Sequence, residues 1–344
     1  MIKLLRLLSL ALALGPSGWG QGTDSFGVLG LFHPRELVLE RVDAQVVVAK
    51  GAGAAVVLNG EPEHRRLLLR ADGDAVAGEA QEAAQWTAGA RDGGAVEFAL
   101  SVPGKLRRVY RGQLTVTARG GELTAVVRID RETAVASIVA AEMAADIPLE
   151  ALKAQAVAAR SFLAGGGRHG AYEFCDTTHC QFLRSPPANE SAAMRAAEAT
   201  RGLILTYQGK TLAAMYGSRC GGRTHSLSEL GMDGWGGYPY FAVTCAACRQ
   251  HPLRWQSRIE SGPEPKAGNE RARLATARQW GWSALPGNDF QASLDGDGWK
   301  IEGQGIGHGV GLCQFGAAGM ARSGAGFRAI LAHYYPNTSV TKAE

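Results

Sequence analysis

The chain has 344 residues, of which 46% are hydrophobic and 20% are charged, and it carries a formal net charge of +4. This length and hydrophobic content exclude a disordered chain and allow one sizeable core or two domains. The charge approaches neutrality once Lys3 and Arg6 of the N-terminal segment are set aside, so neither nucleic acid nor an anionic membrane is an expected partner.

Residues 1–20 have the parts of a secretory signal peptide. Lys3 and Arg6 give a basic start, residues 7–15 form an apolar run, and small residues follow. The run is too short to span a membrane, no cysteine of a lipoprotein follows it, and no later segment looks transmembrane. We expect cleavage of this segment and export to the periplasm or cell-wall space; an uncleaved anchor is the alternative.

Residues 22–108 are predicted to form a β-rich region that positions the rest of the chain or binds a partner. Short apolar or alternating runs between Gly-rich turns indicate strands, at residues 37–42, 45–49, 55–58 and 66–70. Two more predicted strands lie at 113–118 and 123–130.

Helical patterns dominate the sequence after these strands. Pro148 and Glu150 suit the first turn of a helix that ends at a Gly-rich breaker after Leu163. Further predicted helices lie at 135–143, 192–200, 270–280, 314–322 and 326–334, with strands and irregular loops between 203 and 256. This order of strands and helices indicates the α+β class.

One acidic residue interrupts the apolar face of the first predicted helix. Four positions spaced i, i+3, i+4 and i+7 share this face, namely Val135, Ile138, Val139 and Glu142. A carboxylate on a core-facing stripe is costly unless it is paired, protonated or lines a cleft. We therefore predict that Glu142 is a catalytic acid with a raised pKa, or else a structural partner of Arg160 on the next helix.

Five blocks of sequence stand in a recognisable order. They are residues 138–160, Cys-Asp-Thr-Thr-His-Cys-Gln at 175–181, Ser-Arg-Cys-Gly-Gly-Arg-Thr at 218–224, the Gly-rich stretch 307–321, and His-Tyr-Tyr-Pro-Asn-Thr at 333–338. Together they resemble the SpoIID/LytB family, which contains stage II sporulation protein D and the amidase enhancer. The resemblance covers residues 109–340, so we predict a SpoIID-like mixed α+β domain there.

The resemblance implies a lytic transglycosylase that cleaves the MurNAc–GlcNAc bonds of peptidoglycan glycan strands. Glu142 matches the family's catalytic acid, and no cofactor is required for catalysis. Hydrolytic glycosidases usually need two carboxylates, but here the C6 hydroxyl of the sugar attacks and one carboxylate serves as acid and base. The same fold also allows a non-catalytic protein that binds glycan and stimulates a cell-wall amidase.

The resemblance further implies a substrate groove around Glu142. Its expected residues are Gln155, Arg160, Asp176, Thr177, Gln181, Ser218, His308 and Gln314. For the Asp176 block, an Asx-type turn is the structural alternative. Aromatic residues between 235 and 255 are expected either to stack on sugars or to pack in the core, namely Trp235, Tyr238, Tyr240 and Trp255.

The cysteines allow two chemistries. Six cysteines in an exported chain are compatible with disulfides, but the grouping of His and Cys near 169–180 and 245–251 is typical of zinc ligands. The resemblance implies a structural metal bound by His169, Cys175 and Cys180, with Cys220 and Cys248 as possible further ligands. A weaker hypothesis makes Cys313, close to His308, the nucleophile of a cell-wall peptidase.

Overall fold

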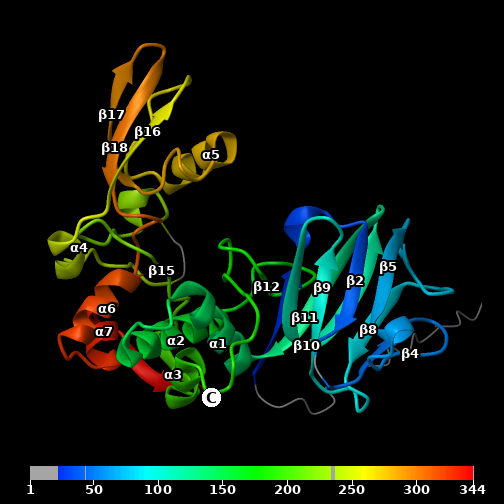
Figure 1. Cartoon of the computed structure of the whole chain (residues 1–344). Helices are drawn as coiled ribbons and strands as arrows, with labels where there is room; N and C mark the ends of the chain where they lie inside the picture. The colour runs from blue at the N-terminus through cyan, green and yellow to red at the C-terminus, as the bar shows by residue number, and fades with distance from the viewer. Residues whose placement is uncertain (1–21, 43, 234–236, 344) are drawn as a thin grey trace, which may run out of the picture.

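A computed structural model of the protein describes residues 22–42, 44–233 and 237–343. The predicted signal peptide and Trp235 lie outside these residues. Within the described ranges, no helix is long and apolar enough to cross a membrane. The chain forms a β-sheet part, a helical part and a small module that projects from the helical part (Figure 1).

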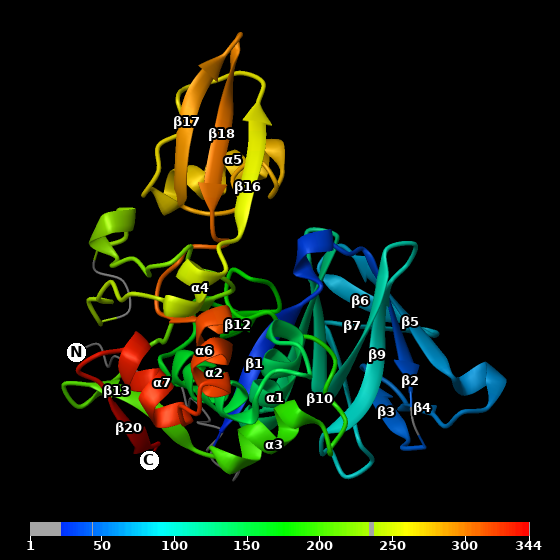
Figure 2. The same cartoon turned by 60° about the vertical axis from the view of Figure 1, so that its left-hand side comes forward.

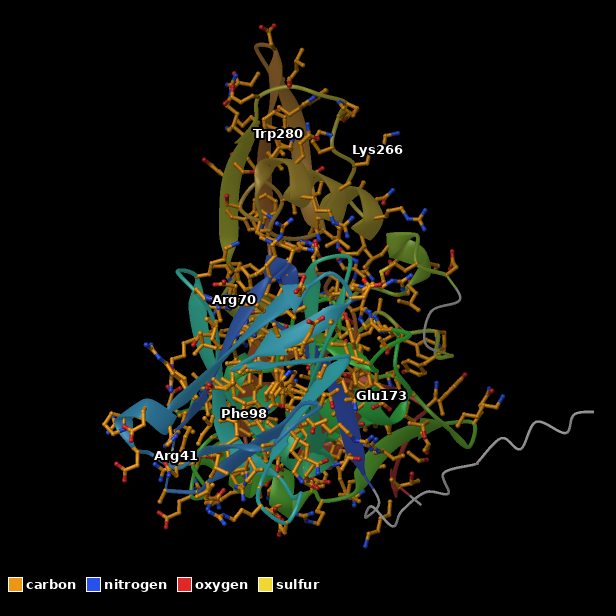
Figure 3. All side chains as sticks on the ribbon, turned by 90° about the vertical axis from the view of Figure 1, so that its right-hand side faces the viewer. Arg41, Arg70, Phe98, Glu173, Lys266 and Trp280 are labelled. Atoms are coloured by element: carbon orange, nitrogen blue, oxygen red, sulfur yellow. The ribbon has the colours of Figure 1, made fainter. Side chains whose placement is uncertain are left out.

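The N-terminal part is a curved sheet with the strand order β12-β1-β11-β10-β9-β2-β5-β6-β7, beside which β8 pairs with β10 and β3, and β3 with β4. Its inner face is apolar: Leu37 and Leu39 lie opposite Leu69 and Leu67, and all four are buried. Phe98 lies inside the curve of the sheet (Figure 3). The strands are β1 (Thr23–Val28), β2 (Glu36–Arg41), β3 (Val47–Lys50), β4 (Val56–Leu58), β5 (Arg66–Asp72), β6 (Ala75–Gly78), β7 (Gln81–Ala83), β8 (Gln85–Gly89), β9 (Val96–Val102), β10 (Leu106–Arg119), β11 (Glu122–Asp130) and β12 (Phe174–Cys175).

The helical part begins where the sheet ends. Asp130 closes β11 and caps the next helix, because its carboxylate accepts a hydrogen bond of 3.0 Å from the Thr133 amide. The helices that gather beside the sheet are α1 (Arg131–Glu142), α2 (Leu149–Ala164), α3 (Ala192–Ala199), α6 (Gln314–Arg322) and α7 (Phe327–Tyr334) (Figure 1). The apolar helix α2 packs against the other four and carries the centre of this core.

Two small sheets complete the helical part. The first joins β13 (Leu203–Tyr207) to β14 (Lys210–Thr211) and β20 (Ser339–Lys342). The second is a parallel pair of β15 (Tyr216–Gly217) and β19 (Leu312–Cys313).

A small module of three antiparallel strands and one helix projects away from the helical part (Figure 2). It has a core of its own, formed by Ile259, Ala284, Leu285, Phe290 and Ile301. Lys266 and Trp280 lie on it, well away from the N-terminal sheet (Figure 3). Its elements are β16 (Arg254–Ile259), α5 (Glu270–Trp280), β17 (Asp289–Asp295) and β18 (Gly298–Gln304), and the short helix α4 (Ala246–Gln250) lies at its base (Figure 2).

The predicted α+β class is correct, and so are the helices predicted at 270–280 and 314–322. The predicted domain boundary between residues 108 and 109 falls inside β10. β10 and β11 belong to the N-terminal sheet, so its continuous segment runs on to Asp130, and β12 joins it from later in the chain.

A buried ion pair holds the helices together. Arg160 of α2 is 1% exposed, and its guanidinium donates to both carboxylate oxygens of Glu132 on α1, at 2.9 and 2.5 Å. It also donates to the carbonyl oxygens of Ala197 and Leu203, each at 3.1 Å. The pair therefore joins α1, α2, the end of α3 and β13.

Replacing Arg160 by Met should destabilise the protein by about 3–5 kcal/mol, because Glu132 would remain buried without its partner. Urea unfolding followed by circular dichroism measures this. The matched control is Arg201→Met, since Arg201 and its partner Glu198 are 55% and 49% exposed and their pair should contribute only about 0–1 kcal/mol. Equal effects of the two substitutions would contradict the role assigned to the buried pair.

Candidate active site

Glu142 is the last residue of α1 and is half-buried. Val135, Ile138 and Val139 on the same face are fully buried, so the predicted apolar face exists. Glu142 lies at the C-terminal end of this face. The side-chain amide of Gln314 donates to Glu142 Oε2 at 3.1 Å. The alternative partner, Arg160, is excluded because it binds Glu132 instead.

Burial raises the pKa of the Glu142 carboxyl above its ordinary value, because it penalises the charged form. The hydrogen bond from Gln314 and the positive charge of Arg184 act in the opposite direction and are smaller. Among the described residues, no other carboxylate contributes to the shift in the pKa of Glu142. The site therefore has one acid that retains its proton to a higher pH than an exposed glutamate does.

Gln314 reaches Glu142 because β19 holds the start of α6. The parallel pairing of Gly217 with Cys313 brings the next residues, Ser218 and Gln314, to the same end of the small sheet. The Phe315 amide donates to the Ser218 carbonyl at 3.1 Å, and Gln314 is only 7% exposed. The predicted residues Ser218 and Gln314 therefore come together at this end, and Gln314 meets Glu142.

Tyr216 connects Gln181 to this site. Its hydroxyl donates to the side-chain carbonyl of Gln181, which is buried. Burial, followed by the negative charge of Glu142, raises the pKa of Tyr216 well above its usual value, so the phenol stays neutral and remains a donor. The sequence prediction missed Tyr216, although it lies two residues before the start of the block at Ser218.

Arg184 supplies the positive charge near Glu142. One of its amino groups donates to the Asp176 carbonyl at 3.0 Å and to the Leu183 carbonyl at 2.7 Å, and its guanidinium lies 3.5 Å from the ring centroid of Phe182. These contacts fix the side chain. Sequence reasoning missed Arg184, since a single arginine after the Gln181 block forms no pattern.

Asp176 is 2% exposed and faces the N-terminal sheet. Its Oδ2 accepts hydrogen bonds from Arg108 at 2.6 Å, Tyr110 at 3.2 Å and the Leu29 amide at 3.3 Å. The predicted groove residue is therefore an anchor that fastens the loop after β12 to the sheet. In this way the N-terminal part positions the loop that carries Gln181 and Arg184.

The block at 169–180 forms a compact group of four ligand-type side chains. His169, Cys175, His179 and Cys180 have nitrogen and sulfur atoms that all lie within 4.8 Å of one another. Cys180 Sγ lies 3.2 Å from His169 Nε2 and 3.4 Å from His179 Nδ1. The three predicted ligands therefore come together with His179, which belongs to the same His and Cys grouping in the sequence but is not one of the ligands that the resemblance implies.

Cys220 and Cys248 do not join this group, which corrects their prediction as further ligands of the same metal. They lie in a second group with Cys245 and Cys313, in which all four sulfurs are within 4.8 Å of one another. All four of these side chains are buried. The structure therefore has two separate clusters. The first cluster is the group of His169, Cys175, His179 and Cys180, and the second is the group of four cysteines.

Several other predicted site residues have structural roles. Gln155 is fully buried and Arg160 sits in the helical core, so neither side chain lines an open surface. Thr177 Oγ1 lies 3.2 Å from Cys175 Sγ and accepts the His179 amide at 3.3 Å, which shapes the turn of the first cluster.

The aromatic residues follow the core alternative where the structure describes them. Tyr238 and Tyr240 are buried, and their hydroxyls donate to the Pro336 and Ala213 carbonyls. Trp255 donates to the Gly305 carbonyl at 2.8 Å and packs near Phe290. These contacts point away from a sugar-stacking platform.

The arrangement of Cys313 and His308 argues against a peptidase. Cys313 Sγ lies 3.6 Å from Cys248 Sγ inside the four-cysteine group. Nδ1 of His308 accepts a hydrogen bond from the Val310 amide at 3.0 Å, and burial lowers the pKa of this histidine. The imidazole therefore supports its own Gly-rich loop beside Tyr216.

Both a family model and individual known proteins match this chain. Residues 119–207 match the family model SpoIID, described as stage II sporulation protein. The chain is 27% identical over 273 residues to an uncharacterized protein of Brachyspira hyodysenteriae, which covers 67% of this chain and 72% of that protein. It is 28% identical over 266 residues to stage II sporulation protein D of Bacillus amyloliquefaciens, and this match covers 64% of this chain and 76% of that protein. The family match includes Glu142 and the first cluster, and it ends before Gln314.

Replacing Gln314 by Leu should raise the pKa of Glu142, because the hydrogen bond that favours its ionised form is lost. Carboxyl ¹³C shifts of labelled glutamate, followed with pH, measure this, and Glu142→Gln identifies the signal. Gln291→Leu, on the exposed side of β17, is the control and should leave the titration unchanged. An unchanged or lowered pKa in the Gln314 variant would show that this contact does not stabilise the carboxylate.

Proposed function

Because this chain belongs to the SpoIID family of stage II sporulation proteins, we propose that it is an exported lytic transglycosylase of peptidoglycan glycan strands. The observation that carries the proposal is Glu142, a half-buried carboxyl with a raised pKa and a neutral amide partner. A group of this kind can hold and release a proton at a reacting oxygen.

The first step requires the protonated form of Glu142. Its carboxyl donates a proton to the oxygen of the MurNAc–GlcNAc bond while the bond between this oxygen and C1 of MurNAc breaks. Positive charge develops on the MurNAc ring, and the GlcNAc hydroxyl leaves. Burial supports this step, because it keeps the proton on Glu142 at a pH where an exposed glutamate would be ionised.

The second step uses the carboxylate that the first step creates. It accepts the proton of the C6 hydroxyl of the same MurNAc, and the C6 oxygen forms a bond to C1. The product carries a 1,6-anhydro ring, water is not consumed, and Glu142 regains its proton. One carboxylate is enough for this sequence, in agreement with the electrostatic isolation of Glu142 from other acids among the described residues.

Neighbouring residues stabilise the ionised state between the two steps. Gln314 donates to the carboxylate, and Arg184 supplies a positive charge whose position is fixed by Phe182 and two backbone carbonyls. Both act more strongly on the charged form than on the neutral one. They limit the rise in pKa, so that Glu142 can act as acid and then as base.

We also propose that the first cluster binds a structural zinc ion. Zinc bonds of about 2.3 Å to sulfur and 2.0–2.1 Å to nitrogen place tetrahedral ligands about 3.6 Å apart, which fits the 3.2–3.6 Å between Cys and His atoms here. Two thiolates and two imidazoles close the coordination shell. The ion would stiffen the loop that carries Gln181 and Arg184.

Substitution Glu142→Gln should lower the rate of glycan cleavage by about 10²–10⁴-fold or more, because the amide cannot donate the proton. Purified glycan strands are digested, and anhydro-muramyl ends are counted by mass spectrometry. The control is Glu198→Gln, an exposed glutamate of α3 that should cleave like the wild type.

Two results would contradict the assignment. Cleavage retained by a folded Glu142→Gln protein would remove Glu142 from the chemistry. Wild-type protein that makes no anhydro ends but stimulates a cell-wall amidase would identify a non-catalytic accessory.

Substitution Cys180→Ser should remove one zinc ion per chain and lower the thermal midpoint, because metal binding contributes to folding. Metal content is measured by mass spectrometry of the purified protein and the midpoint by calorimetry. The exposed His64→Ala variant serves as the control. A disulfide between Cys175 and Cys180, found by alkylation without reduction, would contradict the zinc site.

A further inference from the structure

The second cluster, which we call the four-cysteine group, consists of Cys220, Cys245, Cys248 and Cys313. They come from three distant segments: the loop after β15, the start of α4, and the end of β19. Each side chain is at most 5% exposed, and all four sulfurs lie within 4.8 Å of one another. No role in the proposed glycan chemistry requires them.

We propose that the four-cysteine group is a second zinc site with four thiolate ligands. Around one tetrahedral zinc, with bonds of about 2.3 Å, neighbouring sulfurs lie about 3.8 Å apart. The distance between the sulfurs of Cys248 and Cys313 is 3.6 Å. Two disulfides need two separate close pairs, whereas these sulfurs form one compact group around a common centre.

The spacing of two of the cysteines and the polar groups around the sulfurs are typical of metal ligands. Cys245 and Cys248 have the Cys-x2-Cys spacing, and the short helix α4 begins between them. The Gly316 amide donates to Cys313 Sγ at 3.4 Å, and the Tyr334 hydroxyl lies 3.4 Å from Cys245 Sγ. Such polar contacts orient thiolate ligands and stabilise their charge.

Glycines create the space that the group occupies. A Cβ atom at Gly316 would lie 2.5 Å from Cys245 Sγ and 1.9 Å from the Tyr334 hydroxyl, so only glycine fits there. In the Cys220 loop, Gly221 and Gly222 have φ angles of +77° and +117°, and the Gly222 carbonyl accepts the Cys245 amide at 3.0 Å. The fold therefore brings α6 and this loop to the sulfurs at close range.

A cavity adjoins the four-cysteine group. Cys248 lines a cavity of about 430 Å³ at the base of the projecting module, together with Arg223, His225, Arg249 and Asp289 among others. Zinc bound here would fasten the loop after β15, α4 and the first turn of α6 to one another.

The test uses the full chain purified without chelators and with the first cluster removed. The variant Cys175→Ser/Cys180→Ser should retain one zinc ion per chain. X-ray absorption at the zinc edge should give four sulfur ligands at about 2.3 Å and no nitrogen. Mass spectrometry after alkylation without reduction should find no disulfide among the four cysteines.

A second measurement keeps the test decisive if that variant does not fold. In wild-type protein with both sites filled, the average zinc should have about three sulfurs and one nitrogen, against two of each if only the first cluster binds. Two disulfides in the four-cysteine group, free thiols without metal, or iron in place of zinc would overturn the proposal.

A matched glycine pair adds a structural readout. Gly316→Ala should speed the transfer of zinc from the four-cysteine group to a competing chelator, because the new methyl group displaces Cys245 Sγ. Gly326→Ala is the control, since its Cβ atom would meet only Glu150 at 3.6 Å. Equal transfer rates in the two variants would contradict the place given to the Gly316 backbone in this site.

Discussion

The hydrogen bond between Gln314 and Glu142 is the contact on which the account of this protein depends. It joins two residues that are 172 positions apart in the sequence. For it to form, α1 must end at Glu142 and α6 must begin at Gln314, with both helices packed on the common core around α2. Burial opposes the charge of Glu142 and the amide partly offsets this, so the net effect is a pKa above the ordinary value of a glutamate.

The rest of the architecture holds the surroundings of this carboxyl in place. The N-terminal sheet binds Asp176 through Arg108, Tyr110 and the Leu29 amide, and this fixes the loop that brings Gln181 and Arg184 toward Glu142. Each of the two cysteine clusters includes a residue that directly precedes a side chain near this site. Cys180 directly precedes Gln181, and Cys313 directly precedes Gln314. The first cluster is thus placed to restrain Gln181, the partner of Tyr216, and the second to restrain Gln314, the partner of Glu142.

Sequence reasoning predicted the parts of the molecule that depend on local patterns. The spacing of Val135, Ile138 and Val139 identified the buried face of α1, and the family blocks identified Glu142, Gln314 and most of the first cluster. Periodicity could also identify the class of fold, because strands and helices follow one another in separate runs.

Long-range pairing could not be predicted in the same way. Arg160 was a candidate partner for Glu142 because the two lie on successive helices. In the structure it instead binds Glu132, in the first turn of α1. Asp176 resembled a groove residue because it is acidic and lies in a polar block, but its partners come from β10, more than sixty residues earlier. Tyr216 and Arg184 became visible only when the fold brought them to Glu142.

The central claim is that one carboxylate cleaves the glycan without water, and digestion in ¹⁸O-labelled water tests it most directly. The account predicts that every new end is a 1,6-anhydro sugar that contains no ¹⁸O, because the sugar's own C6 oxygen bonds to C1. Reducing ends that carry ¹⁸O would contradict it, since they would require an attacking water and a second catalytic base.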